Sequence, residues 1–200
     1  MSSSFQEISI IIPCFYSSEA IKNLLITIPK KHEVILVDNS QDELLKEIAD
    51  NYNCNLIVNK QNLGCPTAWN IGAKYATKNF FLFSNPDTLF LPNTVEELMK
   101  AVKRYPKVSA FNPKIIDRKN NHYFKRRSVL MPRSEWMSRK YPKTDCEVSV
   151  LHGSAIFIKK ENFFKLNGFD ERIFLYHDDD DISIRLKREI GPLMYINNSE

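Results

Sequence analysis

The sequence lacks any apolar run long enough to cross a membrane. A membrane-spanning helix needs about 20 consecutive apolar residues, and no stretch here approaches that length, so any membrane contact is expected to be peripheral. The polar residues 1–7 and the short apolar run after them do not form a secretory leader, and we expect none. The four cysteines include no Cys-x-x-Cys pair, and no histidine stands at zinc-finger spacing. This pattern indicates reduced thiols in a cytoplasmic protein, which can still work at the inner face of the membrane.

Two glycine-rich nucleotide-binding motifs are also missing. No Gly-x-Gly-x-x-Gly follows the first apolar run, which argues against the usual dinucleotide fold. No Gly-Lys-Ser/Thr loop is present, which argues against a P-loop ATPase. A nucleotide diphosphate held without such loops needs a divalent cation beside its oxygens, and hard cations prefer carboxylate ligands. The net charge of +4 is too small to indicate nucleic-acid binding by itself.

Apolar runs and amphipathic segments alternate over the first half of the 200 residues, a length typical of one domain. Four apolar runs predict buried strands: residues 8–12, 34–37, 56–58 and 80–83. Four segments between or after them predict helices: residues 18–28, 40–52, 66–76 and 94–104. Ser40 with Glu43, and Thr94 with Glu97, have capping-box spacing. The alternation predicts an α/β fold with a mostly parallel central sheet flanked by helices.

From Phe111 the alternation gives way to an irregular, basic stretch. Residues 117–143 contain nine basic and two acidic side chains. Such a stretch is either a solvated loop region or a face that meets phosphates or an anionic membrane surface. Its aromatic residues are too sparse for an RNA-binding platform, so we expect no nucleic-acid partner. Regular structure is predicted again as a strand at 154–158 and helices at 160–166 and 180–189.

Polar residues follow three of the predicted strands. Pro13–Tyr16 end the first, Asp38–Ser40 the second and Asn85–Asp87 the fourth. Ligands of open α/β sheets bind outside the carboxyl ends of the strands. We therefore expect these residues to outline one crevice, together with the Asn-x-Gly strings at 62–64 and 70–72.

The most concentrated charge is the run Asp178–Asp181, which follows Tyr176 and His177. Adjacent carboxylates repel one another, and each charged neighbour raises the cost of ionising the next. The run therefore needs a compensating cation, full solvation or a catalytic task. The alternative to a catalytic role is a solvated helix start, where aspartates favour the positive end of the helix dipole.

In their order along the chain, these strings resemble the family-2 glycosyltransferases, which have the GT-A fold of the nucleotide-diphospho-sugar transferases, and in particular their rhamnosyltransferase-like branch. The resemblance runs from Ile8 to Leu186. It rests on Ile-Ser-Ile-Ile-Ile-Pro at 8–13, Val-Asp-Asn-Ser at 37–40, the Asn-x-Gly strings at 62–64 and 70–72, Asn-Pro-Asp-Thr at 85–88, Gly-Phe-Asp-Glu at 168–171, and the acidic run. Tyr16, Trp69 and Asp178 depart from the Asn, Arg and Glu that are usual in the family.

The resemblance implies one GT-A catalytic domain over residues 1–200, with a nucleotide-binding half at 1–110 and an acceptor-binding half at 111–200. We expect this domain to lack the family's usual C-terminal segment. Asp87 corresponds to the metal-binding residue of the Asp-x-Asp motif, for Mn²⁺ or Mg²⁺, and Asp38 to a nucleobase contact. The nucleotide-binding residues implied are Pro13, Phe15, Asp38, Asn62, Gly64, Asn70 and Asn85. The acceptor-binding residues implied are His152, Gly153 and Ser154.

The resemblance also implies an inverting reaction in which Asp179 acts as general base, with Asp178 beside it in the same catalytic motif. The donor would be a dTDP- or UDP-sugar. The acceptor would be a saccharide or a lipid-linked saccharide, in the synthesis of a cell-surface polysaccharide. Residues 117–143 would supply any peripheral membrane contact. The alternative is a catalytically silent module that binds nucleotide-sugars or a partner protein.

Overall fold

A computed structural model describes residues 7–200, so the expected absence of a leader lies outside the described residues. Eight strands form the central sheet: β1 (Ser9–Cys14), β2 (Glu33–Asp38), β3 (Asn55–Val58), β4 (Phe80–Ser84), β5 (Ala110–Pro113), β8 (Cys146–Val148), β9 (Ala155–Lys159) and β10 (Leu193–Ile196). Six helices accompany them: α1 (Ser18–Thr27), α2 (Glu43–Tyr52), α3 (Cys65–Tyr75), α4 (Thr94–Arg104), α5 (Lys160–Lys165) and α6 (Asp178–Glu189). None of these helices is long and apolar enough to cross a membrane.

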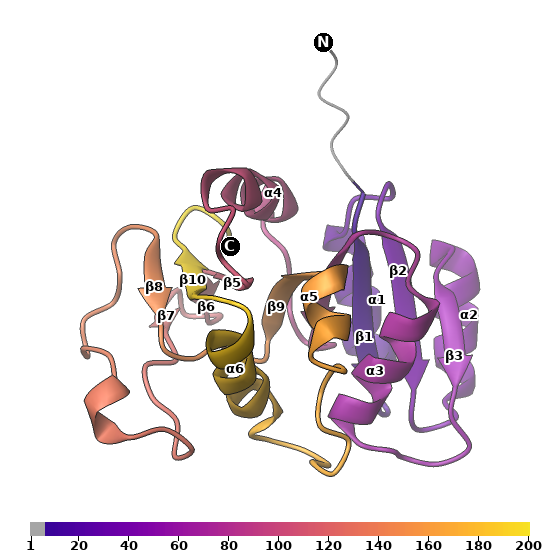
Figure 1. Cartoon of the computed structure of the whole chain (residues 1–200). Helices are drawn as coiled ribbons and strands as arrows, with labels where there is room; N and C mark the ends of the chain where they lie inside the picture. The colour runs from indigo at the N-terminus through magenta and orange to yellow at the C-terminus, as the bar shows by residue number, and fades with distance from the viewer. Residues whose placement is uncertain (1–6) are drawn as a thin grey trace.

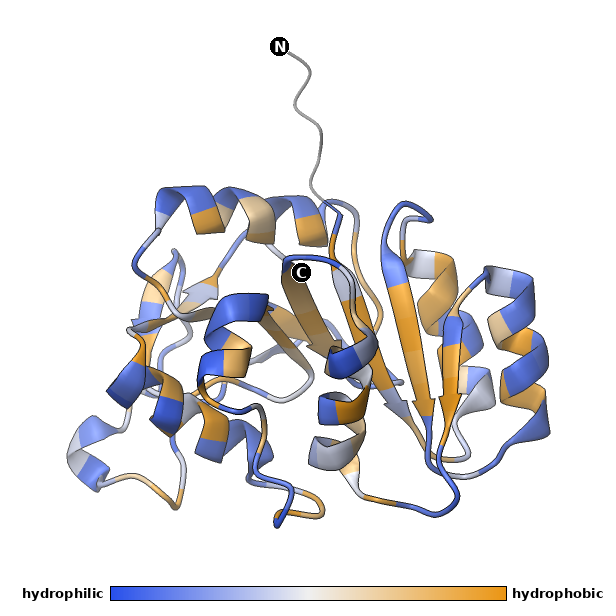
Figure 2. Ribbon diagram, turned by 45° about the vertical axis from the view of Figure 1, so that its right-hand side comes forward, coloured by the Kyte–Doolittle hydropathy of each residue, from blue (hydrophilic) through white to orange (hydrophobic). Residues whose placement is uncertain are grey.

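The strand order is β3-β2-β1-β4-β9-β5-β10-β8, a single sheet that runs through the whole described chain (Figure 1). Four of its seven pairings are parallel, which confirms the predicted mostly parallel α/β architecture. Buried apolar residues form a cluster on each face of the sheet, and the strands are coloured largely hydrophobic in Figure 2. Helices α1, α2 and α4 pack on one face, and α3, α5 and α6 on the other.

Strand β9 is the one that builds the site, because it runs antiparallel between β4 and β5. Its first residue, Ala155, pairs with Ser84 at the end of β4. The amide N–H of Asn85 then donates to the carbonyl of Ser154 at 3.1 Å. Two segments that are far apart in the sequence are therefore adjacent at the carboxyl edge of the sheet.

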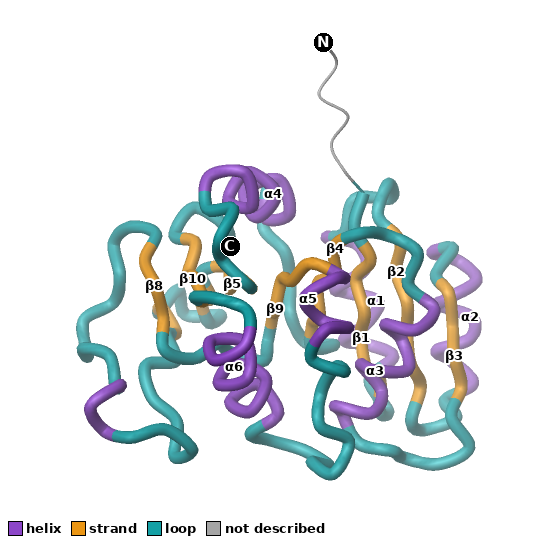
Figure 3. Tube along the Cα trace, viewed as in Figure 1, coloured by secondary structure: helices purple, strands orange, loops and turns teal. Residues whose placement is uncertain are grey.

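The second half is more regular than its sequence predicts. Strands β5, β8 and β10 all join the sheet, although the residues of β5 and β8 were expected to be irregular and no strand was expected after Pro192. The chain between β5 and β8 is mostly loop (Figure 3), with a hairpin of β6 (Ile115–Ile116) and β7 (His122–Tyr123) and a short 3₁₀ turn at Arg133–Glu135. Short strands buried by their neighbours carry no periodicity of their own, and this explains why they were missed.

The predicted capping boxes are wrong in detail. Helix α2 begins after Asp42, whose carboxylate accepts from the N–H of Leu44 at 3.0 Å. Ser40 instead donates its hydroxyl to Asp38. Helix α4 follows Asn93, which is left-handed with φ 69°, and the hydroxyl of Thr94 donates backwards to the carbonyl of Leu91.

Candidate active site

The acidic run forms the first turn of α6, two residues earlier than predicted. Tyr176 and His177 both take left-handed backbone angles, with φ 64° and 62°, and turn the chain sharply into the helix. Asp178 and Asp180 are buried, whereas Asp179 is partly exposed. The partial positive charge of the helix N-terminus favours carboxylates here, but it does not neutralise four of them.

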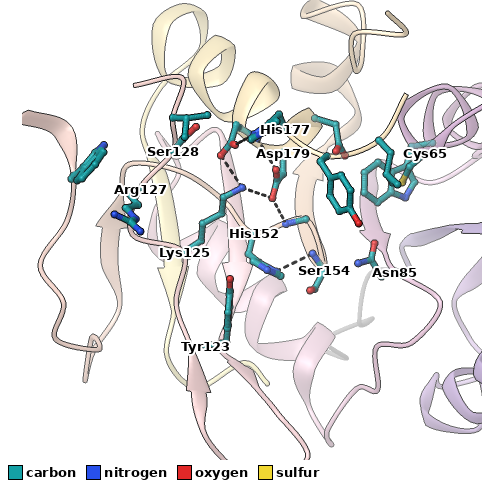
Figure 4. Close-up of a pocket in the computed structure, with 18 residues that line it drawn as sticks. Cys65, Asn85, Tyr123, Lys125, Arg127, Ser128, His152, Ser154, His177 and Asp179 are labelled. Atoms are coloured by element: carbon teal, nitrogen blue, oxygen red, sulfur yellow. Dashed lines mark hydrogen bonds and ion pairs between the residues drawn. The ribbon is translucent and has the colours of Figure 1, made fainter. Parts of the chain in front are cut away.

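Lys125 supplies the compensating cation. Its Nζ lies 2.7 Å from Oδ2 of Asp179 and 2.7 Å from Oδ1 of Asp180 (Figure 4). Asp180 also pairs with Nδ1 of His177 at 2.8 Å. From the sequence a compensating cation was one of three alternatives, and residues 117–143 offered nine basic candidates with no means of choosing among them.

Asp181 points away from this group and has a separate task. Its Oδ2 pairs with the guanidinium of Arg185 at 2.6 Å. The same guanidinium donates to the carbonyls of Leu166 and Gly168. Asp181 therefore stabilises the turn that ends α5, and it belongs to the scaffold.

The carboxylates of the run differ in their affinity for protons. Burial and the neighbouring charge of Asp179 raise the pKa of Asp178 to about 6. Burial also opposes the ionisation of Asp180, but hydrogen bonds from Lys125 and His177 outweigh it and lower the pKa of Asp180. Asp178 is therefore the carboxyl that changes charge closest to neutral pH.

Residues 152–154 meet Asp179 directly. The N–H of Gly153 donates to Oδ2 of Asp179 at 2.8 Å. A Cβ at position 153 would lie 3.2 Å from the same oxygen, so a side chain there would press on the carboxylate. The N–H of Ser154 donates to Nδ1 of His152 at 3.2 Å, and burial lowers the pKa of His152, so its ring is neutral. The predicted acceptor segment and the predicted base are thus brought together.

A cavity of about 670 Å³ opens beside this contact (Figure 4). Its walls come from both halves of the chain. They include Trp69 and Asn85 on one side, and Lys125, Arg127, Val129 and Trp136 on the other, with residues 152–154 and 176–180 between them. The concave form, the convergent polar groups and the raised pKa of Asp178 mark it as the candidate active site.

Trp69, one of the departures from the family pattern, has an unusual place in this cavity. Its ring is buried and stacks on Phe169 with centroids 4.9 Å apart. Its indole N–H has no hydrogen-bond partner within residues 7–200.

Asp87 lies outside the first cavity, in an exposed turn after β4. It lines a second cavity of about 790 Å³, and Ser154 lines both. Over residues 7–200 no three His, Cys, Asp or Glu side chains gather as a metal cage. One exposed carboxylate fits a cation that takes its remaining ligands from phosphate oxygens and water, as Mg²⁺ does.

Asp38 is buried at the end of β2, with 1% of its surface exposed. Its Oδ1 accepts from the N–H and the hydroxyl of Ser40, at 2.7 and 2.6 Å, and its Oδ2 accepts from the N–H of Asp42 at 2.8 Å. Pro13 is buried beside it in β1. Phe15, in contrast, is 53% exposed and packs edge-on against Tyr16. The geometry makes Asp38 the organiser of the 38–42 turn, and its contact with a nucleobase stays a prediction.

We expect Asp38→Ala to lower the free energy of unfolding by about 2 kcal/mol, because the partly buried N–H groups of Ser40 and Asp42 lose a charged acceptor. Urea unfolding measures this loss. If Asp38 also touches a nucleobase, calorimetry with uridine or thymidine diphosphate will show weaker binding. Lower stability with unaltered nucleotide affinity would make Asp38 purely structural, and unaltered stability would contradict its hydrogen-bonded role.

The remaining predicted nucleotide-binding residues hold loops in place. The side chain of Asn62 accepts from the N–H of Gly64, and Gly64 has φ 82° with Phe174 so close that a Cβ would collide with its carbonyl. Both donors of the Asn70 amide are used, by the carbonyl of Phe169 and the carboxylate of Glu171. The contacts of Asn70 therefore do not support its predicted place at the nucleotide, because they tie α3 to the 169–171 turn instead.

Comparisons with known proteins identify the family of the chain. The family described as "Glycosyl transferase family 2" matches residues 9–166. The N-acetylglucosaminyl-diphospho-decaprenol L-rhamnosyltransferase of Mycobacterium tuberculosis is 26% identical over 84% of this chain and 64% of its own length. The low-salt glycan biosynthesis hexosyltransferase Agl10 of Haloferax volcanii is 25% identical over 92% of this chain and 62% of its own. The chain thus spans less than two-thirds of these relatives.

Solved structures show the same fold. Residues 1–349 of TarS from S. aureus superpose with a TM-score of 0.73 at 20% identity, covering 96% of this chain and 58% of that one. The mannosyltransferase PcManGT from Pyrobaculum calidifontis, in complex with GDP-Man and Mn²⁺, gives a TM-score of 0.72 at 15% identity, covering 97% and 55%. The predicted GT-A fold is confirmed.

Proposed function

The chain belongs to glycosyl transferase family 2, and from this premise we propose that it transfers a sugar from a dTDP- or UDP-sugar to a lipid-linked saccharide, with inversion. The observation that carries the proposal is the contact between Asp179 and Gly153 at the wall of a cavity large enough for a sugar. The name of the mycobacterial relative, an L-rhamnosyltransferase acting on N-acetylglucosaminyl-diphospho-decaprenol, supports a lipid-linked acceptor.

The chemistry proposed for Asp179 is general-base catalysis. An acceptor hydroxyl is a poor nucleophile until a carboxylate takes its proton, and a positioned base contributes about 10² to 10⁴ in rate. The hydroxyl then attacks the anomeric carbon from the side opposite the departing nucleotide, which inverts that carbon. Gly153 fixes the carboxylate through its N–H, and a position 153 without a side chain leaves room for the acceptor.

Asp87 would hold a divalent cation together with the donor's diphosphate, and such a cation supplies Lewis-acid stabilisation of the leaving group. The exposed position of Asp87 at the end of β4 supports this role. Two structural neighbours carry Mn²⁺ in their complexes, GalNAc-T7 with UDP and PcManGT with GDP-Man. Exposed Phe15 and the Asn85 side chain lie at the same edge of the sheet, where the nucleotide would bind.

The rim of the cavity supports an acceptor with an apolar part. Val129, Leu175 and Tyr176 line the cavity and are 78%, 51% and 74% exposed. They come from two segments far apart in the chain, and Arg127 lies beside Val129 at the same wall. Apolar side chains next to basic ones suit the boundary between lipid headgroups and acyl chains. We therefore place peripheral membrane contact at residues 117–143 and this rim.

Liposome co-sedimentation checks the membrane contact. We expect binding to vesicles that contain acidic lipid to weaken about fivefold for each of Arg139→Ala and Lys140→Ala, since each basic residue near the surface contributes about 1 kcal/mol. Lys46→Ala, an exposed lysine of α2, is the matched control and should leave binding unchanged. Equal binding to acidic and neutral vesicles would contradict the proposal.

The test of the function is a donor screen in the presence and absence of manganese. Thermal shift detects which nucleotide-sugars bind, because a ligand of the native state raises its stability. Transfer to lipid-linked saccharides and hydrolysis of the donor are then measured with the donors that bind. Transfer or hydrolysis supports the enzyme. Binding without any turnover would favour the alternative, a silent nucleotide-sugar-binding module.

A further inference from the structure

Lys125 occupies a position that the proposed reaction does not explain. Its side chain is 18% exposed, and its Nζ is 2.7 Å from carboxylate oxygens of two consecutive aspartates. It belongs to the loop after β7, not to the sheet or to α6. Because Lys125 contacts both carboxylates at the wall of the candidate active site, its positive charge affects how readily each of them takes a proton.

The hydrogen bonds of Asp179 show how little freedom the carboxylate has. Oδ2 accepts from the N–H of Gly153 at 2.8 Å and pairs with Lys125, and Oδ1 accepts from the N–H of Asp180 at 2.9 Å. Three donors fix the orientation of the carboxylate. A base that must be ionised before the acceptor arrives needs such support beside three other aspartates.

We propose that Lys125 is a positioning residue that keeps Asp179 ionised and oriented, and thereby sets the lower end of the pH range in which the enzyme works. This inference rests on the proposed function of Asp179. The charge of Lys125 acts at short range and in a partly buried place, where an ion pair is worth more than at an open surface.

The other titratable groups around Asp179 cannot replace Lys125. Asp178 and Asp180 on α6 carry the same sign as Asp179 and disfavour its ionisation. His152, from the loop before β9, is held neutral by burial and by the hydrogen bond that its ring accepts. His177 pairs with Asp180, and the thiol of Cys65 is neutral because burial raises its pKa. Lys125 is the cation in direct contact with the proposed base within the described residues.

Removing the positive charge at position 125 should shift the acidic limb of the pH profile in one direction. Without it, Asp179 and Asp180 bind protons more tightly, so the base is protonated and inactive over a wider acidic range. An opposite charge at this distance shifts a carboxyl pKa by about one to three units. We expect Lys125→Met to move the acidic limb of the pH profile of kcat/KM upwards by about one unit or more, with activity recovering at high pH.

Two companion variants separate charge from hydrogen bonding and from folding. Lys125→Arg keeps the charge, and its acidic limb should stay close to that of the wild type. Lys125→Gln keeps a donor but no charge, and it should behave like Lys125→Met. Urea unfolding of each variant at pH 8 shows that the proteins compared are folded. The proposal would be overturned if the acidic limb of the kcat/KM profile did not move in Lys125→Met, or if that variant lost activity equally at all pH values.

A second readout does not depend on turnover. Carbon-detected NMR titration of the aspartate carboxyl groups in the wild type and in Lys125→Met reports protonation directly. Raised carboxyl pKa values in the variant support the inference, and unchanged values refute it, whether or not a donor has been found. Absence of transfer in the wild type, in contrast, would count against the proposed function and not against the ion pair.

Discussion

Asp179→Asn should lower the rate of sugar transfer by about 10²-fold or more while leaving the binding of donor nearly unchanged. Asparagine has the size of aspartate and can still accept from the N–H of Gly153, so the wall of the cavity keeps its form. It cannot take a proton from the acceptor hydroxyl. Steady-state transfer kinetics and calorimetric titration with the nucleotide diphosphate measure the two quantities separately.

Asp178→Asn is the matched control, because Asp178 lines the same cavity one residue away. The pKa of Asp178 is raised to about 6 in the folded protein. When a carboxyl group binds its proton more tightly in the folded than in the unfolded state, the protein loses stability as the pH rises through the folded-state pKa. Asparagine at 178 avoids this loss, so the variant should be more stable than the wild type at pH 8 and not at pH 4.

These two variants decide which carboxylate is the base. If Asp178→Asn keeps most of its transfer rate and Asp179→Asn does not, the assignment to Asp179 holds. If Asp178→Asn is inactive and Asp179→Asn is active, the base is Asp178. Asp178 is the alternative base, because it lines the same cavity and its carboxylate is not held in an ion pair with Lys125, which contacts Asp179 and Asp180.

The second large effect is expected for Asp87→Ala, which should abolish the tightening of nucleotide diphosphate binding by manganese and lower transfer by about 10²-fold or more, because the leaving group loses its Lewis acid. The fold should remain intact, because the side chain of Asp87 is exposed and makes no hydrogen bond or ion pair with residues 7–200. Calorimetric titration with and without manganese measures the coupling.

Asp50→Ala controls for the loss of an exposed aspartate far from the carboxyl edge of β4, since Asp50 lies on α2. Its manganese dependence should equal that of the wild type. A manganese dependence that survives in Asp87→Ala would remove Asp87 from the metal site and leave it as a turn residue before Leu89.

Much of the first half of the fold was predictable because its signals are local. Buried strands of a parallel sheet are continuous apolar runs, and the helices between them repeat their apolar side chains every three or four residues. The predicted strand at 80–83 ends one residue before β4, and the predicted helix at 66–76 begins and ends one residue after α3. The start of α4 was predicted correctly, but the start of α2 and the capping contacts of both helices were not, since a capping side chain has several nearby partners and the sequence does not choose among them.

For the candidate site, the sequence indicated several of the residues but not the contacts that they make. The order of the strings pointed to Asp178, Asp179 and residues 152–154, which the structure brings to the wall of one cavity. The metal-binding role of Asp87, which lies outside that cavity, stays a prediction. For Asp38 the sequence offered both a ligand contact and a cap with Ser40, and its three hydrogen bonds within the turn favour the second. No local pattern around Asn70 indicated that its amide holds the 169–171 turn.

The sequence by itself therefore determined the α/β architecture, the family and the position of the acidic run at a helix start, because periodicity and local order of residues are properties of short segments. Only the tertiary structure decided what those residues touch. The antiparallel insertion of β9 brings Ser154 to Asn85, and the loop after β7 brings Lys125 to Asp179. Such contacts depend on how the whole chain packs. Lys125 is one of nine basic residues in 117–143, and its distance in space from the aspartates, not a feature of its own segment, distinguishes it from the others.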